Sequence, residues 1–219
     1  MDPLVEKVVS RALASGPTSA LGVRLHQRGT LRLKPGGPWF RFQAEQVIWA
    51  GSSRFRWDAR ISIAPFLKMR VVDAYEDGRG TLDVRFWKLF RVATASGPGV
   101  DAGELLRYMA ELPWCPYAYR DNPDLTIRAV DERRLSVSCG SEEVRLTLDP
   151  AGDVLGAFAA RRPRLVGDEY VSSPWSGTFS GHESLGGTRV PRMAVVSWQL
   201  AEGPFEYFRG ELVDLHRMR

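Results

Sequence analysis

Residues 54–63 read Arg-Phe-Arg-Trp-Asp-Ala-Arg-Ile-Ser-Ile, and in this run apolar side chains alternate with charged or polar ones. Successive side chains of a β-strand point to opposite faces, so a period of two is typical of a strand with one buried and one solvated face. The same period recurs in residues 40–44 and predicts another strand there. The alternation therefore predicts an antiparallel sheet whose two faces differ in polarity.

Further runs that suit strands follow at short spacing, at 68–76, 81–90, 125–130, 135–139, 144–148, 154–160, 174–182, 190–200 and 205–215. Turn-forming residues separate them, and Asp77-Gly78 predicts a hairpin between the first two of these runs. About ten or eleven strands joined in this way indicate a meander, and so wide a sheet twists, curls or closes. We expect a mainly β fold, a curved antiparallel sheet or half-open β-barrel that cups an apolar cavity.

Two segments have helical rather than strand periodicity. In residues 1–20, apolar residues recur three and four positions apart, and Asp2 precedes them as an N-cap. In residues 101–118, Asp101 is the expected N-cap, with Glu104 as its partner in a variant of the capping box. We expect this second helix to plug the concave face of the sheet.

The chain of 219 residues is predicted to form a single domain. The plug helix would separate a first strand meander at 22–95 from a second at 124–216. No low-complexity tract, internal repeat or linker divides the sequence. A composition with 44% hydrophobic residues and seven tryptophans supplies enough apolar surface for a core and for a ligand cavity.

Composition and motifs also argue against several classes of function. The net charge is +4, but the basic residues are dispersed, so we expect no nucleic-acid partner. His26, His182 and His216 fall in no metal-binding spacing, and the sequence contains no phosphate-binding loop. We therefore expect no metal and no cofactor.

The sequence also predicts where the chain resides. The first residues lack the basic and apolar regions of a signal peptide, and no run approaches the roughly eighteen apolar residues of a membrane-spanning helix. We expect a soluble cytoplasmic protein without an integral membrane segment.

Several segments, taken in order, resemble a family of bacterial proteins described only as a domain of unknown function. They are FQAEQ (42–46), RVVDAYEDGRG (70–80), ASG (95–97), RYMAELPWCP (107–116), PWSG (174–177), GTRVP (187–191) and FEYFRG (205–210). The match covers most of the chain from about residue 22. The resemblance implies a fold like that of the LolA lipoprotein carriers, a half-open barrel with helices on the concave side, and it implies no established reaction.

Asp73 and Tyr75 are the first candidate site residues. On an extended strand they share a face with Met69 and Val71, so both are expected to point inward. An inward carboxylate is costly without a partner. Asp73 is therefore expected either in a buried ion pair near the hairpin or at a catalytic or ligand-binding position, and Tyr75 is a candidate ligand contact.

Arg107 and Glu111 stand one helical turn apart on the plug helix and can pair. A carboxyl group in an apolar cavity has a raised pKa, and Glu111 is therefore a candidate general acid or base. Arg107 is a candidate ligand-binding residue. The alternative is a salt bridge that ties the helix to the sheet.

Aromatic residues beside a guanidinium can stack a planar or anionic ligand. This argument gives a further set of candidate ligand-binding residues, namely Trp114, Tyr117, Trp175, Trp198, Tyr207 and Arg209. Their alternative role is ordinary packing in the core.

Three functions are compatible with these features. The first is binding of an apolar or amphipathic small molecule, such as a lipid or an acyl or polyketide-like chain. The second is a cofactor-independent enzyme, a cyclase or isomerase of specialised metabolism, that holds a reactive conformer in the same cavity. The third is a protein-interaction module, which would need a filled core and a large exposed apolar patch.

Overall fold

One antiparallel sheet dominates the computed structural model, which describes residues 2–86 and 90–219. Its thirteen strands within these residues confirm the predicted mainly β fold. The first meander contains β1 (Gly22–Leu31), β2 (Phe40–Trp49), β3 (Phe55–Ala64), β4 (Leu67–Glu76), β5 (Arg79–Phe86) and β6 (Phe90–Ala95). The second contains β7 (Thr126–Asp131), β8 (Arg134–Cys139), β9 (Glu142–Leu148), β10 (Val154–Val166), β11 (Glu169–Leu185), β12 (Thr188–Leu200) and β13 (Gly203–Met218).

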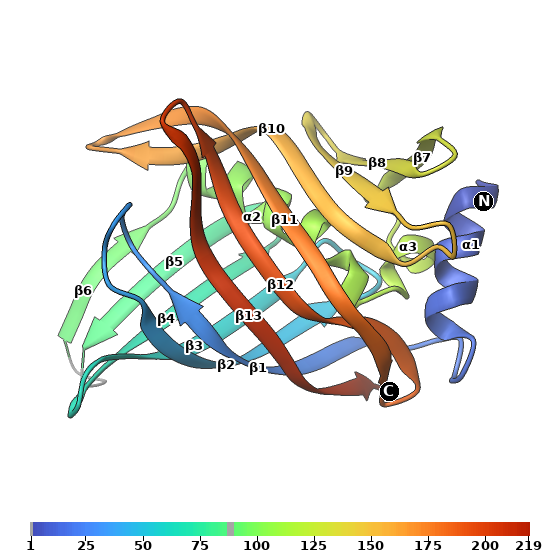
Figure 1. Cartoon of the computed structure of the whole chain (residues 1–219), viewed down its shortest axis with the longest axis horizontal. Helices are drawn as coiled ribbons and strands as arrows, with labels where there is room; N and C mark the ends of the chain where they lie inside the picture. The colour runs from blue at the N-terminus through green and yellow to red at the C-terminus, as the bar shows by residue number, and fades with distance from the viewer. Residues whose placement is uncertain (1, 87–89) are drawn as a thin grey trace.

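The two meanders join into a single curved sheet because β1 pairs with β13. The strand order runs from β6 through β1 and β13 to β7, so β6 and β7 are the two edge strands of the sheet. Figure 1 shows the sheet curling until β11, β12 and β13 cross over the strands of the first meander. The curvature creates the concave side that the sequence predicted.

The hairpin between β4 and β5 forms where the sequence predicts it. Asp77 and Gly78 both adopt positive φ angles, 50° and 77°, as a two-residue turn of this kind requires. The run predicted at 81–90 is divided in the structure: β5 ends at Phe86, β6 begins at Phe90, and residues 87–89 lie outside the described part of the chain.

Helix α1 (Pro3–Leu13) begins as predicted, with the Asp2 carboxylate accepting a hydrogen bond from the Leu4 N–H at 2.9 Å. Its buried face carries Val5, Val8 and Val9, and the helix contacts β7 and β12. It therefore covers one end of the sheet, where the N-terminus lies in Figure 1.

Helix α2 (Pro98–Ala110) begins earlier than predicted, so the assignment of Asp101 as its N-cap is wrong. Gly97 is the N-cap and Pro98 occupies the first turn, where a proline loses no helical hydrogen bond. The Asp101 carboxylate instead accepts a hydrogen bond from the Gly80 N–H at 2.7 Å. A side chain at Gly80 would meet the Val100 carbonyl oxygen at 2.5 Å, so glycine is needed for this close approach of helix to strand.

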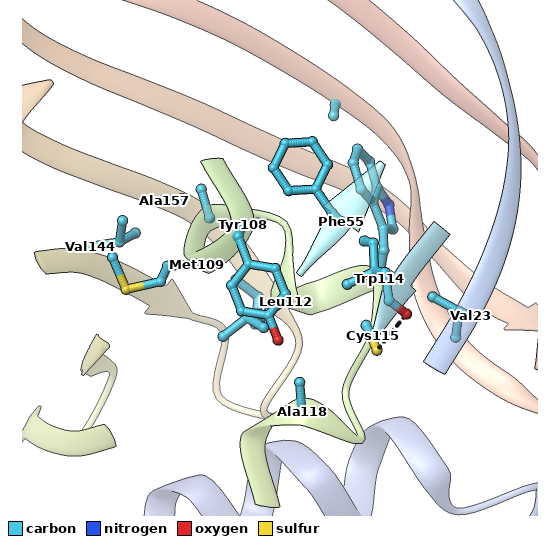
Figure 2. Packing of buried hydrophobic residues seen from close by; sticks show 14 of the residues in the cluster. Val23, Phe55, Tyr108, Met109, Leu112, Trp114, Cys115, Ala118, Val144 and Ala157 are labelled. Atoms are coloured by element: carbon cyan, nitrogen blue, oxygen red, sulfur yellow. Dashed lines mark hydrogen bonds between the residues drawn. The ribbon is translucent and has the colours of Figure 1, made fainter. Parts of the chain in front are cut away.

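The plug helix packs against both meanders, in contact with β4 and β5 on one side and with β8, β9 and β10 on the other. Its core-facing residues include Leu106, Tyr108 and Met109, each at most 1% exposed. Figure 2 shows this packing, with Phe55 of β3 and Val144 of β9 around the helix. The short helices η1 (Leu112–Trp114) and α3 (Ala118–Asp121) then lead out toward α1.

Candidate ligand cavity

A cavity of about 400 Å³ lies between α2 and the concave face of the sheet. Most of its lining is aliphatic or aromatic and comes from both meanders: Leu31, Leu33, Trp57, Ile61, Met69, Val71, Leu82, Val84, Trp175, Phe179, Ala194, Val196, Tyr207 and Phe208. Leu33 is 70% exposed, which places the mouth of the cavity near the end of β1. The concave side thus holds a hollow with an apolar wall.

Charged side chains of α2 form one side of this hollow. Glu104, Arg107 and Glu111 are spaced three and four residues apart, so they lie on one face of the helix and its C-cap. All three line the cavity, and Asp73 of β4 lines it beside them. The polar face of the helix is therefore turned toward the cavity, while its apolar face supplies the core.

Arg107 lies at the centre of this charged cluster. Its Nη1 donates to Asp73 Oδ2 at 2.6 Å, and its Nε donates to Glu111 Oε1 at 2.9 Å. Its guanidinium carbon also lies 5.0 Å from the ring centroids of Phe55 and Trp57, within range of a cation–π interaction. Although burial opposes the charged form, the surrounding carboxylates raise the pKa of Arg107 above its ordinary value.

Glu111 is held by a hydrogen-bonded chain that crosses the sheet. Its second carboxylate oxygen accepts a bond from Gln46 of β2. The Gln46 side chain accepts from Gln27 at 3.1 Å, and Gln27 in turn accepts from the Trp57 indole at 2.9 Å. Both oxygens of Glu111 are therefore occupied by protein donors.

Asp73 and Glu104 retain unused hydrogen-bonding capacity. Asp73 Oδ1 and Glu104 Oε2 are buried without a hydrogen-bond partner in the described part of the chain. Burial, together with the charge of Asp73, raises the pKa of Glu104 to about 8, and burial raises the pKa of Asp73. Glu104 is therefore predominantly protonated at neutral pH and can donate a proton as well as accept one.

A further cation, Arg162 of β10, reaches the cavity from the other meander. The β10–β11 register shifts between Ala159 and Arg162, and this bulge turns Arg162 to the buried face with Ala157 and Ala159. The guanidinium lies 4.7 Å from the Trp175 ring and 5.7 Å from the Trp198 ring. Arg162 lines the cavity and is 8% exposed.

The structure brings together six of the ten residues that the sequence singled out. Asp73, Arg107 and Glu111 lie in the charged cluster, and Trp114, Trp175 and Tyr207 also line the cavity. The Trp175 indole donates to the Tyr207 hydroxyl at 2.9 Å, and the Trp114 indole donates to the Pro191 carbonyl at 2.9 Å. These bonds fix the aromatic rings in place.

The other four lie outside the lining. Tyr75 faces inward but is packed in the core, because its register partner Gly80 lies against the start of α2 and the helix covers this end of β4. Tyr117 is fully buried beyond η1, with its hydroxyl 2.9 Å from Thr188 Oγ1. Trp198 is absent from the lining and stacks on Tyr207, with ring centroids 6.1 Å apart.

Arg209 lies on the outer face of the sheet, where its side chain is 55% exposed and bonded to Glu206. The β12–β13 register shifts between Val196 and Ser197, leaving Tyr207 as the extra residue between Glu206 and Phe208. Tyr207 and Phe208 consequently both line the cavity, and Arg209 falls on the opposite face.

Glu104, Arg162 and Arg32 are the charged cavity residues that sequence reasoning missed. Glu104 could have been found from its spacing to Arg107 and Glu111 on one helical face. Arg162 could not have been found in this way, because the bulge that turns it inward has no clear signal in the sequence.

Strand pairing also brings together three potential metal ligands. One ligand atom each of His26, Asp214 and His216 lies within 4.8 Å of the others, at the β1–β13 ladder. The spacing of these residues in the sequence does not reveal the cluster, because it depends on pairing between distant strands. Their side chains are 46% to 61% exposed, and His216 Nε2 lies 2.8 Å from Asp214 Oδ2.

Within the described residues, no helix combines the length and the apolar character needed to cross a membrane. No match to the sequence was found among the curated proteins. Solved structures share the fold at low sequence identity. A LolA superfamily protein from Nitrosomonas europaea is 10% identical with a TM-score of 0.50, and the alignment covers 99% of this chain and 92% of that one.

A putative outer membrane lipoprotein-sorting protein domain from Vibrio parahaemolyticus is 12% identical, with a TM-score of 0.55 and coverage of 98% of this chain and 90% of that one. These likenesses confirm the LolA-like half-barrel. The model of a family of unknown function, DUF6920, matches residues 3–216. The match spans nearly the whole sequence, and the chain therefore belongs to the DUF6920 family.

Proposed function

We propose that the protein binds an apolar or amphipathic small molecule in the cavity between α2 and the sheet. The observation that carries this proposal is the lining, an apolar wall with charged groups at the α2 side, at Arg162 and at Arg32 beyond the end of β1. Its volume of about 400 Å³ lies in the range typical of small-molecule sites, roughly 300–1,000 Å³.

The way α2 is held supports a cavity that persists without a ligand. The Arg107–Asp73 ion pair and the Asp101–Gly80 hydrogen bond tie the helix to β4 and β5 at two points. A helix fixed in this way cannot settle deeper into the concavity, so the space beside it stays open. An interaction module would instead be favoured by a filled concave face together with a large exposed apolar patch.

The structural neighbours are consistent with such a ligand. One of them is named as a putative lipoprotein-sorting protein, and the shared half-barrel gives both chains a concave side of the same kind. A lipid or another molecule with an acyl or polyketide-like chain is therefore the ligand class that we propose here. The cytoplasmic location expected from the sequence stays a prediction.

Glu104 favours a second candidate function, a cofactor-independent cyclase or isomerase. A carboxyl group in an apolar cavity, with a pKa of about 8 and an oxygen that accepts no hydrogen bond from any described residue, is suited to acid–base catalysis near neutral pH. Glu111, the residue favoured from the sequence, is less available because both of its oxygens are engaged. Asp73 retains one unpartnered oxygen and remains a candidate.

Native mass spectrometry of the purified protein, followed by organic extraction, tests the proposal. We expect one apolar or amphipathic molecule per chain, or stoichiometric binding of an added probe such as dodecanoate or dodecanol. Absence of a co-purified molecule together with failure to bind either probe would contradict it. Chemical conversion of an extracted molecule by wild type, but not by Glu104→Gln, would favour the enzyme.

A further inference from the structure

Arg162 is a buried cation for which the described protein provides no counter-ion in direct contact. It is 8% exposed and makes no hydrogen bond or ion pair with any described residue. By contrast, Arg107 in the same cavity has carboxylate partners at 2.6 and 2.9 Å. An isolated buried charge is costly, so a guanidinium in this position calls for a partner.

The aromatic contacts of Arg162 leave its donors unused. Trp175 and Trp198 contact the guanidinium through their rings, which interact with its charge but accept no in-plane hydrogen bond. The Trp175 indole is itself fixed by its bond to Tyr207. The N–H groups of a guanidinium form a planar fork that matches the two oxygens of a carboxylate.

We propose that Arg162 binds the carboxylate head group of an amphipathic ligand whose apolar tail occupies the cavity. This inference rests on the proposed ligand-binding function and specifies the chemistry of the ligand. The carboxylate supplies the missing counter-ion, and the aromatic and aliphatic wall accommodates the tail.

The surrounding charges favour a single negative charge over the two of a phosphate monoester. Asp73 on β4 and Glu104, Arg107 and Glu111 along α2 also face the cavity, as does Arg32, whose Nε donates to the Glu206 carbonyl. The charge of Arg162 lowers the pKa of both Asp73 and Glu104, so any anion bound to Arg162 lies within electrostatic reach of these two acids. A protonated Glu104 tolerates one nearby carboxylate and can donate to it, whereas a dianion would be repelled more strongly by Asp73.

Dodecanoate and dodecanol test the inference, because they share a tail and differ in the head group. Their affinities are measured by isothermal titration calorimetry at neutral pH with wild type, Arg162→Gln and Arg164→Gln. Arg164 is the matched control: it lies on the same strand and 6.0 Å from the Trp198 ring, but outside the cavity lining.

We expect wild type to bind dodecanoate more tightly than dodecanol, and Arg162→Gln to weaken dodecanoate binding by roughly 10- to 100-fold, the usual effect of losing a charged hydrogen bond. Dodecanol affinity should be unchanged in that variant, and Arg164→Gln should behave as wild type. Circular dichroism and a melting temperature establish that each variant is folded.

Equal binding of dodecanoate and dodecanol by wild type would overturn the carboxylate assignment and leave the proposed function standing. The same conclusion would follow if Arg162→Gln weakened both probes equally or neither of them. Failure of wild type to bind either probe would count against the proposed function and the inference together. The wild-type comparison decides the matter even if Arg162→Gln does not fold.

Discussion

Arg107 Nη1 lies 2.6 Å from Asp73 Oδ2, and this ion pair joins the plug helix to β4 inside the concave face. The sequence left two roles open for each residue, a structural salt bridge or a contact with a ligand. The structure shows the salt bridge, and because both side chains line the cavity, contact with a ligand stays a prediction.

Arg107→Met should strongly destabilise the protein. The variant would leave the carboxyl groups of Asp73, Glu104 and Glu111 together in a buried site without their shared cation. Removing one partner of a buried pair costs about 3–5 kcal/mol. Urea denaturation followed by circular dichroism measures the change in the free energy of unfolding.

Arg145→Met is the control for that variant. Arg145 also forms an ion pair, with Glu143, but its side chain is 56% exposed. Exposed pairs contribute about 0–1 kcal/mol, so the loss should be small. Equal losses in the two variants would show that the Arg107 cluster does not behave as a buried ion-pair network.

Glu104→Gln should change how stability depends on pH. The pKa of Glu104 is raised from 4.5 to about 8 by folding, so the unfolded chain loses this proton first as the pH rises. The unfolded state is then favoured, and the wild-type free energy of unfolding falls between about pH 4.5 and pH 8 before it levels off. Asp73 has the same sign of shift and is retained in both proteins.

The measured quantity is the free energy of unfolding of wild type minus that of Glu104→Gln, from urea titrations across this pH window. We expect the difference to decrease by up to a few kcal/mol as the pH rises. A constant difference would mean that Glu104 titrates alike in the folded and unfolded chains.

Two glycine substitutions test the docking of α2. Gly80→Ala forces a methyl group to within 2.5 Å of the Val100 carbonyl oxygen and should cost about 1–3 kcal/mol. Gly103→Ala, inside the helix, meets no atom within 4 Å and should be neutral or stabilising by up to about 1 kcal/mol. The melting temperatures of both variants, compared with that of wild type, measure these effects. A Gly80→Ala variant that melts at the wild-type temperature would show that the helix is not tightly docked there.

Glu111→Gln should destabilise the fold. The carboxylate accepts hydrogen bonds from Arg107 and Gln46, one at each oxygen, and an amide would place an NH2 group opposite one of these two donors. The expected loss is about 1.5–3 kcal/mol, against almost none for the exposed Glu143→Gln. Denaturant titration of both variants measures the losses. A fully stable Glu111→Gln that loses an observed activity would instead support the acid–base role predicted from the sequence.

Local periodicity is sufficient to predict the curved antiparallel sheet, whereas the LolA-like half-barrel follows from the family resemblance. Phe55 and Trp57 alternate with charged neighbours and are buried as expected, and Asp77-Gly78 forms the expected hairpin. Such features depend on residues adjacent in the chain, and the sequence reports them directly. Arg107 and Glu111 likewise pair because one helical turn brings them together.

Bulges explain the main errors at the site. A one-residue register shift reverses which face each later side chain occupies. The shift in β13 places Arg209 outside, and the shift in β10 places Arg162 inside. Neither shift is set by local composition. The alternation of residue types therefore predicts the wrong face of the sheet for side chains beyond the bulge.

The start of α2 was missed for a different reason. Asp101 is a good N-cap by residue type, but its carboxylate is committed to the Gly80 N–H of a distant strand. The helix can then begin at Pro98, capped by Gly97, and Glu104 falls in its interior on the cavity face rather than in its first turn. The local sequence is compatible with a helix capped by Gly97 or by Asp101, and the tertiary contact of Asp101 with Gly80 selects the first.

A cavity-filling substitution tests the central claim most directly. Gly177 of β11 lines the cavity, and a Cβ there meets its nearest atoms only at 3.7 Å from Trp175 and 4.0 Å from the Val195 carbonyl oxygen. Gly177→Leu should therefore fill the cavity without moving the backbone. Thr178→Leu is the matched control, because the next residue of the strand is exposed on the opposite face.

The decisive measurement is the affinity of wild type and both variants for dodecanol and dodecanoate, by calorimetry, with melting temperatures to establish folding. We expect Gly177→Leu to lose binding of both probes by at least about tenfold while it stays folded, and Thr178→Leu to bind as wild type does. Unchanged binding by a folded Gly177→Leu would contradict the claim that this cavity is the ligand site.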